Sequence, residues 1–326
     1  MKTCVVLLHV ILCLPVFLQG QTRPEISTVD ITYFWLAFDQ LSEAKNHADS
    51  VEIIQKNYID ICSNVYSKYI QRSNISAEEY VTLFTIYPNY WRAIRPLTEQ
   101  ITNRRDELET ALQKLAATIP GFKIPDIYFG IGCLRQGGTI KGNTIIIGAE
   151  LAAADTLIDK SELSTWLKSV VGKTGDIVAM TAHESIHVQQ TWFPLGEFFS
   201  LAKHQQLRLL NMAILEGSAD YITTSVLGLN INAGIREYGL QHECELWKNF
   251  EASIANDPFD YSKWLYNGNS ARDMPADMGY FIGYQITQAY FNSEADKNKA
   301  YTTIFKRGKY RKVFEESDYK HLVCGS

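Results

Sequence analysis

The sequence has no excess of basic residues and no long apolar run beyond its N-terminus. Its 31 lysines and arginines are outnumbered by 36 aspartates and glutamates, which gives a formal charge of −5 at pH 7. This balance provides no general attraction to nucleic acid or to anionic lipid, so we expect no nucleic-acid partner. Because no second apolar segment is long enough to cross a bilayer, we also expect no transmembrane span in the mature chain.

Cysteines are few, and none has the spacing of a metal-binding or redox motif. The 326 residues include 6 cysteines, of which Cys62, Cys133, Cys244 and Cys324 lie beyond the N-terminal segment, with no CxxC pair. Two interpretations stay open. The four are buried thiols, or in an oxidising compartment they form up to two disulfides in one of three connectivities.

The N-terminal segment has the composition of a secretory signal. Lys2 precedes an apolar run over residues 4–18, and a small residue, Gly20, stands at the expected cleavage point. We therefore predict a signal peptide at 1–20 and a secreted or periplasmic protein, with a retained membrane anchor as the alternative. Cys13 lies between two leucines instead of after a small residue, so we expect lipid anchoring to be unlikely.

The remainder predicts an α+β fold that is mostly helical. Apolar residues recur at three and four positions throughout 21–120, which we interpret as an N-terminal helical region. Residues 124–132 and 143–148 have the composition of short strands, with glycine turns between them. Further helices are expected over these ranges: 31–49, 51–69, 76–86, 92–115, 150–154, 161–171, about 176–192 and 201–227.

The segment His183-Glu184-Ser185-Ile186-His187 carries the strongest chemical signal in the chain. Residues four apart lie on one face of a helix, so both imidazoles can reach a single Zn²⁺ while Glu184 faces its open coordination position. Thr174 or Asp176 can cap the start of this helix. The alternative is a chance match to a short pattern, which a third ligand would argue against.

A third ligand is available on the next long helix. Glu216 follows His187 by 29 residues, a separation that allows a turn and a return on an adjacent helix. Two histidines and one glutamate form a known catalytic zinc set. Asp220 lies one turn further along, where it can accept the second ring N–H of a ligand histidine. Small residues at 217–219 would let the two helices approach closely. A solvated acidic pair is the alternative.

With these motifs in place, the chain resembles the gluzincin branch of zinc metallopeptidases. Segments 183–190 and 215–222 are similar to those of predicted zinc-dependent peptidases related to the gliding-motility lipoprotein B family, and the likeness extends from about residue 127 to 290. The resemblance implies a zincin-like catalytic region over 121–326, forming one compact unit with the helical region. It also implies one Zn²⁺ on His183, His187 and Glu216, with Glu184 as general base.

Four further residues are candidates for contacts with substrate. Tyr280 and Tyr284 lie one helical turn apart and could stabilise an oxyanion, although buried packing is the alternative. Gly138 and Thr139 lie in the β unit, whose edge could bind an extended peptide or be purely structural. We expect a secreted metallopeptidase acting on a peptide or protein. The alternatives are a binding or assembly protein on the same scaffold and a zinc hydrolase of a non-peptide amide.

Overall fold

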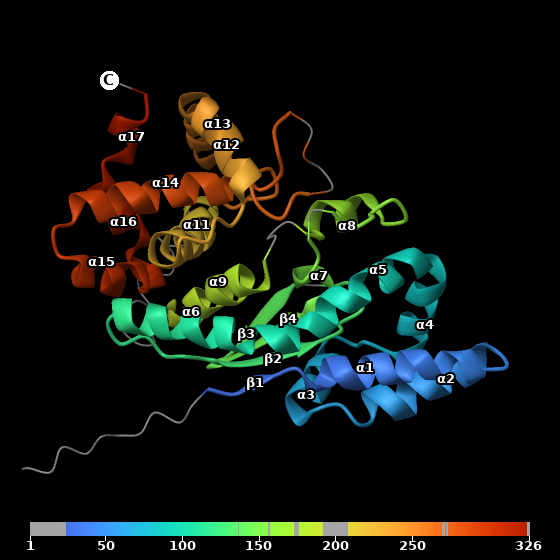
Figure 1. Cartoon of the computed structure of the whole chain (residues 1–326). Helices are drawn as coiled ribbons and strands as arrows, with labels where there is room; N and C mark the ends of the chain where they lie inside the picture. Colours follow the sequence, from blue (N-terminus) through green and yellow to red (C-terminus); the bar gives the residue numbers. More distant parts are fainter. Residues whose placement is uncertain are drawn as a thin grey trace, which may run out of the picture.

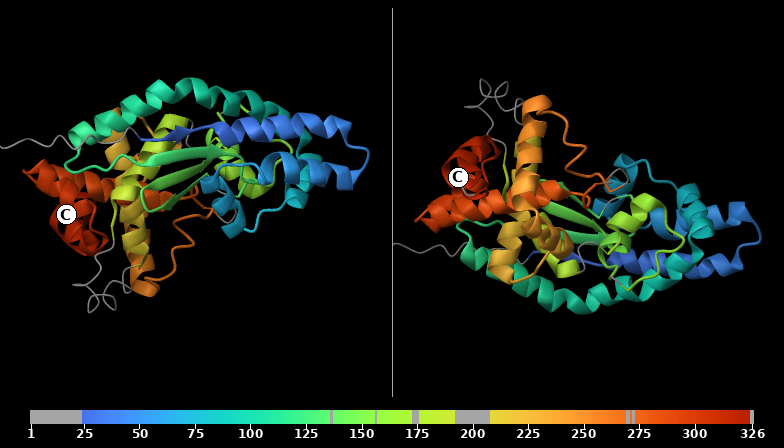
Figure 2. Two further views of the ribbon diagram at one scale, coloured as in Figure 1. Left: turned by 90° about the horizontal axis from the view of Figure 1, so that it is seen from below. Right: turned by 90° about the horizontal axis from the view of Figure 1, so that it is seen from above.

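A mixed four-stranded sheet lies between the N-terminal helices and the C-terminal helices (Figures 1 and 2). The computed structural model describes residues 24–135, 137–155, 157–172, 176–191, 208–268, 271 and 273–324. The predicted signal peptide lies outside these residues. Helices predominate in the described chain, so the expectation of a mostly helical α+β fold is confirmed.

The sheet has the strand order β1-β2-β4-β3. Its strands are β1 (Ile26–Ser27), β2 (Asp126–Gly130), β3 (Gly138–Lys141) and β4 (Thr144–Gly148). β2 runs parallel to β1 and to β4, whereas β3 forms an antiparallel hairpin with β4 and is an edge strand. The strands predicted at 124–132 and 143–148 are therefore present.

Strand β1 was missed, because it occurs at the start of a segment that has helical periodicity. Its two residues pair with Ile127 and Tyr128 of a strand about 100 residues away. The backbone N–H of Ile127 donates to the carbonyl of Glu25 at 2.7 Å, and Asp126 accepts from the N–H of Glu25 at 2.9 Å. This pairing depends on distant partners, which local periodicity does not reveal.

The N-terminal region is helical, as predicted, but its first two long helices are divided. Asn46 accepts the N–H of Asp49, and Ser63 accepts the N–H of Tyr66. These caps start new helices inside the ranges expected to be continuous. The α-helices are α1 (Val29–Gln40), α2 (His47–Ile54), α3 (Asn64–Arg72), α4 (Ala77–Ile86), α5 (Pro88–Glu99) and α6 (Arg105–Thr118). Short 3₁₀ and π segments occupy Leu41–Glu43, Gln55–Ile59 and Gln100–Arg104.

The second half of the chain contains the helices that build the candidate site. They are α7 (Ala149–Ala152), α8 (Thr165–Val170), α9 (Ile177–Gln189), α11 (Arg208–Leu227), α12 (Ala233–Gln241), α13 (Glu243–Asn256), α14 (Met278–Ser293), α15 (Lys297–Ile304), α16 (Tyr310–Ser317) and α17 (Tyr319–Leu322). A 3₁₀ turn, η4, occupies Arg307–Lys309. None of the helices that the structure describes is long and apolar enough to cross a membrane.

Buried apolar residues form two clusters. One gathers residues between Ile26 and Val178 around the sheet and the N-terminal helices, and the other gathers residues between Leu115 and Tyr319 around α11 and α14. The two clusters overlap in sequence because α6 and α9 contribute to both. The boundary predicted between 120 and 121 stays a prediction.

Helices α11 and α14 pack at very short range through two glycines. A Cβ added to Gly217 would lie 2.1 Å from the backbone nitrogen of Tyr284, and one added to Gly283 would lie 1.7 Å from the carbonyl oxygen of Ala213. Any side chain at either position would separate the helices. We predicted that the small residues near 217 would face the HExxH helix, and for Gly217 this is wrong, because its neighbour is α14.

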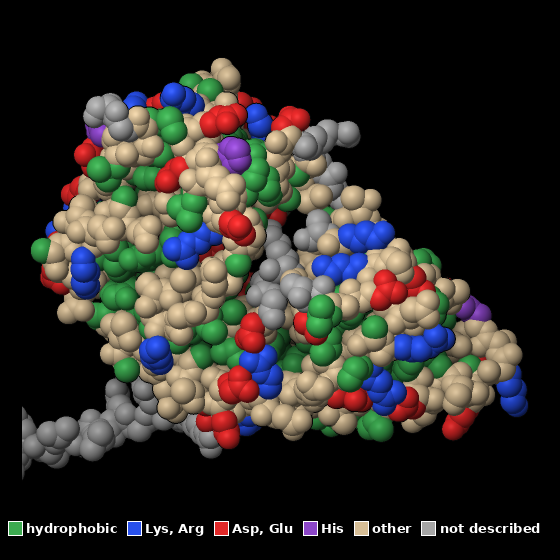
Figure 3. Space-filling view, turned by 45° about the horizontal axis from the view of Figure 1, so that its top comes forward, with side chains coloured by type: hydrophobic (Ala, Val, Ile, Leu, Met, Phe, Trp, Pro, Cys, Tyr) green, Lys and Arg blue, Asp and Glu red, His purple; other side chains and the backbone are tan. Residues whose placement is uncertain are grey.

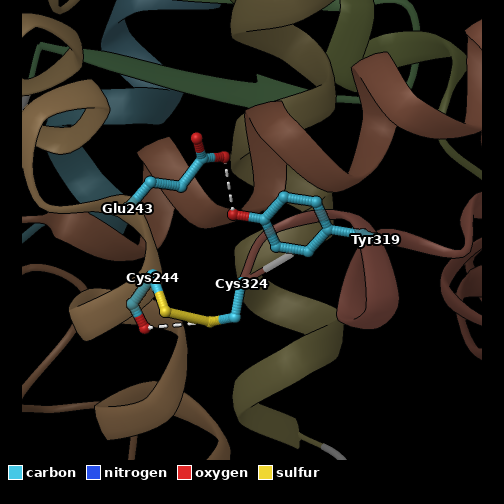
Figure 4. Close-up of a disulfide and its surroundings, with 4 residues drawn as sticks. All are labelled: Glu243, Cys244, Tyr319 and Cys324. Atoms are coloured by element: carbon cyan, nitrogen blue, oxygen red, sulfur yellow. Dashed lines mark hydrogen bonds between the residues drawn. A yellow bond between two sulfur atoms is a disulfide. The ribbon is translucent and has the colours of Figure 1, made fainter. Parts of the chain in front are cut away.

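One disulfide connects α13 to the end of the chain (Figure 4). Cys244 and Cys324 are bonded across 80 residues of sequence, whereas Cys62 and Cys133 are free thiols. Beside the bond, the Tyr319 hydroxyl donates to Glu243 at 2.9 Å. Of the interpretations left open by the sequence, the structure therefore selects a single bridge among the four cysteines.

Candidate metal centre

Helix α9 carries the HExxH residues, and its start is fixed by Asp176. The carboxylate of Asp176 accepts the backbone N–H groups of Val178 and Ala179 at 2.7 and 3.2 Å. Arg104, in the 3₁₀ segment that precedes α6, forms an ion pair with the same carboxylate, with an Nη2–Oδ2 distance of 2.9 Å. The predicted cap at Asp176 is thus present, and the alternative cap, Thr174, lies outside the described residues. The helix contacts α6, α11 and the β3–β4 hairpin, which fixes its orientation.

The structure brings the three predicted ligands together. The Nε2 atoms of His183 and His187 are 3.0 Å apart, and Glu216 Oε2 lies 3.2 Å from His187 Nε2 and 3.5 Å from His183 Nε2. Zinc bonds of about 2.0–2.1 Å in tetrahedral geometry place ligand atoms roughly 3.4 Å apart. Among the described residues this trio is a group able to hold a metal ion.

The outer nitrogens of the two imidazoles face hydrogen-bond acceptors. His183 Nδ1 lies 2.8 Å from Asp220 Oδ1, and His187 Nδ1 lies 2.6 Å from Gln190 Oε1. With the ring protons on Nδ1, facing these acceptors, both Nε2 atoms would direct lone pairs toward Glu216 Oε2. Three lone pairs within 3.5 Å of one another repel unless a cation lies between them. The donor set therefore fits a divalent metal such as zinc.

The pKa shifts follow from the same clustering. Burial lowers the pKa of the His183 imidazole, but the contacts with Asp220 and Glu216 outweigh burial and raise it well above its usual value. Burial raises the pKa of Glu216, but the two imidazoles outweigh this effect and lower it well below its usual value. These carboxylates thus favour positive charge at the imidazoles, which a metal ion or protons can supply.

The amide of Gln190 is held in one orientation. Its Nε2 donates to the carbonyl of Leu215 at 3.0 Å and to the hydroxyl of Ser218 at 2.9 Å, which leaves Oε1 to face His187. Its backbone carbonyl also accepts from Arg307 at 3.1 Å. Sequence reasoning missed this residue, although a glutamine three positions after a ligand histidine was a usable signal.

Tyr266 is the second residue that sequence reasoning missed. Its hydroxyl donates to Glu216 Oε1 at 2.6 Å, on the opposite side of the carboxylate from the imidazoles. Burial, and then the negative charge of Glu216, raise the pKa of this phenol. No sequence signal pointed to Tyr266, because it lies in an irregular loop 50 residues beyond its partner.

A cleft of about 500 Å³ opens onto the three ligands. Glu184 lies in it beside the edge strand, where a Cβ on Gly138 would be 2.7 Å from Glu184 Oε1. Apolar side chains form part of the wall, including Trp166, Val170 and Met180. On the face shown in Figure 3, acidic and basic side chains are interspersed and form no continuous basic patch.

The other predicted substrate residues divide between the cleft and positions outside it. Tyr280 lines the cleft, and its ring stacks on that of His183 with a centroid distance of 6.4 Å. Tyr284 is not among the cleft residues; its ring lies 4.4 Å below the guanidinium of Arg236. Thr139 lies in β3 and is also not among the lining residues, whereas Gly138 is. One helical turn separates the two tyrosines, and both line a smaller pocket beside Arg236, but of the two only Tyr280 also lines the cleft.

Comparison with known proteins identifies the family. No curated protein and no solved structure gives a significant match. A family model described as gliding motility protein GldB matches residues 19–321. Its label marks a lipoprotein family, so our expectation that lipid anchoring is unlikely finds no support in it. Since the match covers nearly the whole chain, this protein belongs to the gliding motility protein GldB family.

Proposed function

We propose that this protein is a secreted or periplasmic zinc-dependent metallopeptidase of the gluzincin type. The observation that carries the proposal is the convergence of His183 Nε2, His187 Nε2 and Glu216 Oε2 within 3.5 Å at the base of an open cleft. The outer nitrogen of each histidine lies within 2.8 Å of a side-chain oxygen, as is usual for histidine ligands of a metal, and this supports the proposal.

His183, His187 and Glu216 would hold the ion. A zinc ion bound there would lower the pKa of a coordinated water to roughly 7 and polarise the carbonyl of the scissile bond. Glu184, on the same helix and in the same cleft, would accept the proton of the attacking water and pass it to the leaving amine. Tyr280, which lines the same cleft, would donate to the developing oxyanion.

The edge strand beside Glu184 supports a peptide as substrate. Among the described strands β3 pairs with β4 alone, so its other edge would be open to an extended chain. A peptide added to that edge by main-chain hydrogen bonds would pass beside Gly138 and hence beside the carboxylate of Glu184. The apolar wall with Trp166 and Val170 would then accommodate an apolar side chain of the peptide.

A second candidate is a binding or assembly protein that keeps the same scaffold. The observation in its favour is the family description, which names a motility protein and not an enzyme. In this case a metal would have a structural role or none, and Glu184 would have no chemical task. A zinc hydrolase of a non-peptide amide is a third possibility that substrate profiling would reveal.

Metal analysis combined with a peptide library distinguishes these functions. We expect the purified wild type to hold one zinc and to cleave peptides in a reaction stopped by a chelator. Glu184→Gln is expected to keep zinc and lose hydrolysis, whereas His187→Ala is expected to lose zinc. Glu43→Gln and His321→Ala, at exposed positions, are matched controls. A zinc-loaded wild type that cleaves no peptide would exclude the peptidase, and normal zinc in His187→Ala would exclude the ligand assignment.

A further inference from the structure

Tyr266 donates a hydrogen bond to Glu216, the candidate ligand that lies on a different helix from the two histidines. We propose that Tyr266 is a positioning residue that holds Glu216 as a ligand through a single oxygen. The inference rests on the proposed zinc site and adds to it the residue that controls the geometry of the glutamate. Nothing in the resemblance or in the family assignment points to this tyrosine.

The two oxygens of Glu216 have different neighbours. Oε2 faces His187 and His183 at 3.2 and 3.5 Å, whereas Oε1 accepts the Tyr266 hydroxyl at 2.6 Å. A carboxylate with two available oxygens can bind a metal through one or both. A strong hydrogen bond to Oε1 favours binding through Oε2 alone, which keeps one coordination position for water.

With Tyr266, each of the three ligands has one outer partner. Asp220 faces His183, Gln190 faces His187, and Tyr266 faces Glu216. Asp220 and Gln190 are buried and lie on or next to the helices that carry the ligands, whereas Tyr266 is 54% exposed. The exposed ring forms part of the cleft wall while its hydroxyl reaches the buried carboxylate. Tyr266 is therefore the outer partner that a substrate would touch.

The backbone at Tyr266 is held in an unfavourable conformation. Its φ is 56°, in the left-handed region that a tyrosine rarely adopts. The next residue, Asn267, forms reciprocal hydrogen bonds with Asp277: each backbone N–H donates to the side chain of the other, at 3.2 and 2.7 Å. This closed pair fixes the loop just before α14. Strain maintained by surrounding contacts is typical of functional positions, and here it directs the phenol to Glu216.

Replacing Tyr266 by phenylalanine removes the hydroxyl and keeps the ring, so it tests the role of the hydroxyl alone. The ring of Tyr266 is edge-on to Tyr261 at 6.0 Å and to Tyr280 at 6.4 Å, and these contacts persist in Tyr266→Phe. Tyr261→Phe is the matched control, because Tyr261 packs on the same ring while the hydroxyl that donates to Glu216 is that of Tyr266. Tyr266→Asn is a second variant, since asparagine tolerates the left-handed backbone but is too short to hold the carboxylate.

The experiment measures zinc affinity by competition with a chromogenic chelator, together with the visible absorption of the Co²⁺-substituted protein. We expect Tyr266→Phe and Tyr266→Asn to bind zinc roughly 10- to 100-fold more weakly than the wild type, as for other outer partners of metal ligands. Their cobalt bands should weaken as the coordination number rises. Tyr261→Phe should match the wild type, and thermal unfolding checks that each variant is folded.

Wild-type zinc affinity and an unchanged cobalt spectrum in both Tyr266 variants would overturn the inference. A wild type that binds no zinc would overturn both the inference and the proposed function. A wild type that binds zinc without cleaving peptides would overturn only the proposed peptidase, because the role of Tyr266 is measured by affinity and spectrum. The two failures are therefore distinguishable.

Discussion

Gly138 is the position at which a single methyl group should disable the proposed general base without disturbing the fold. Its backbone φ is not in the left-handed region, so alanine is compatible with the strand. The added Cβ would lie 2.7 Å from Glu184 Oε1, 2.8 Å from Cδ and 3.0 Å from Cγ. Because these atoms belong to the outer part of a flexible side chain, we expect the Glu184 carboxylate to move and the strand to stay.

The required movement sets the size of the effect. Non-bonded heavy atoms prefer separations of about 3.5–4.0 Å, so the carboxylate of Glu184 must shift by roughly 1 Å. A misplacement of that size can lower a rate by about 100-fold. This corresponds to about 2.7 kcal/mol of activation free energy. The free energy of unfolding should not fall, since replacing glycine by alanine in a strand interior is favourable by up to roughly 1 kcal/mol.

The assay compares kcat/KM on a peptide selected from the library, zinc content and thermal unfolding. Gly138→Ala should lose activity about 100-fold and keep wild-type zinc and stability, because the ligand side chains are not touched. Gly234→Ala in α12 is the control, because a Cβ there meets no heavy atom within 4 Å and Gly234 is not among the cleft residues. Full activity in Gly138→Ala would show either that Glu184 is not the base or that its working position is not beside the strand.

Further predictions concern the metal, the disulfide and a buried acid. Gln190→Leu should weaken zinc binding about 10- to 100-fold in a chelator competition, because His187 loses the acceptor that fixes its tautomer. Cys324→Ser should lower the free energy of unfolding in denaturant by up to about 4.5 kcal/mol, since its bond to Cys244 closes a loop of 80 residues. Burial raises the pKa of Glu150 from 4.5 to about 7. The protonated acid is favoured in the fold, so its stabilisation is full below about pH 4.5 and is lost as the pH rises through 7. In a pH series of urea unfolding curves, the free energy of unfolding should therefore fall by roughly 3 kcal/mol between about pH 4.5 and 7, and Glu150→Gln should abolish this fall. The same fall in Glu150→Gln would show that Glu150 does not cause it.

Local rules predicted the HExxH helix and its cap. The period of an α-helix places His183 and His187 on one face wherever that helix lies, and an aspartate before an apolar run is a frequent cap. The same local rules failed near the start of the chain, where the caps at Asn46 and Ser63 divide helices that looked continuous. They also missed β1, which exists only through its pairing with β2.

Sequence periodicity did not predict contacts between segments that are distant in the sequence. The sequence favoured Tyr284 as strongly as Tyr280, because a separation of one turn allows both to share a face. In the structure Tyr280 lines the cleft, whereas the Tyr284 ring lies against the guanidinium of Arg236. Gly217 was expected to allow close packing against the HExxH helix, but in the structure it packs against α14.

By itself the sequence determined which side chains have the donor chemistry and helical spacing of a metal site and which carboxylate is the candidate base, because spacing and donor chemistry are properties of short segments. Tertiary structure decided how those side chains are held. The acceptor at His187, the phenol at Glu216 and the strand beside Glu184 come from a helix end, a loop and a sheet edge. The phenol and the strand depend on how distant segments pack, which no local spacing encodes. Gln190 lies three residues after His187, but its amide is oriented by Leu215 and Ser218 of α11.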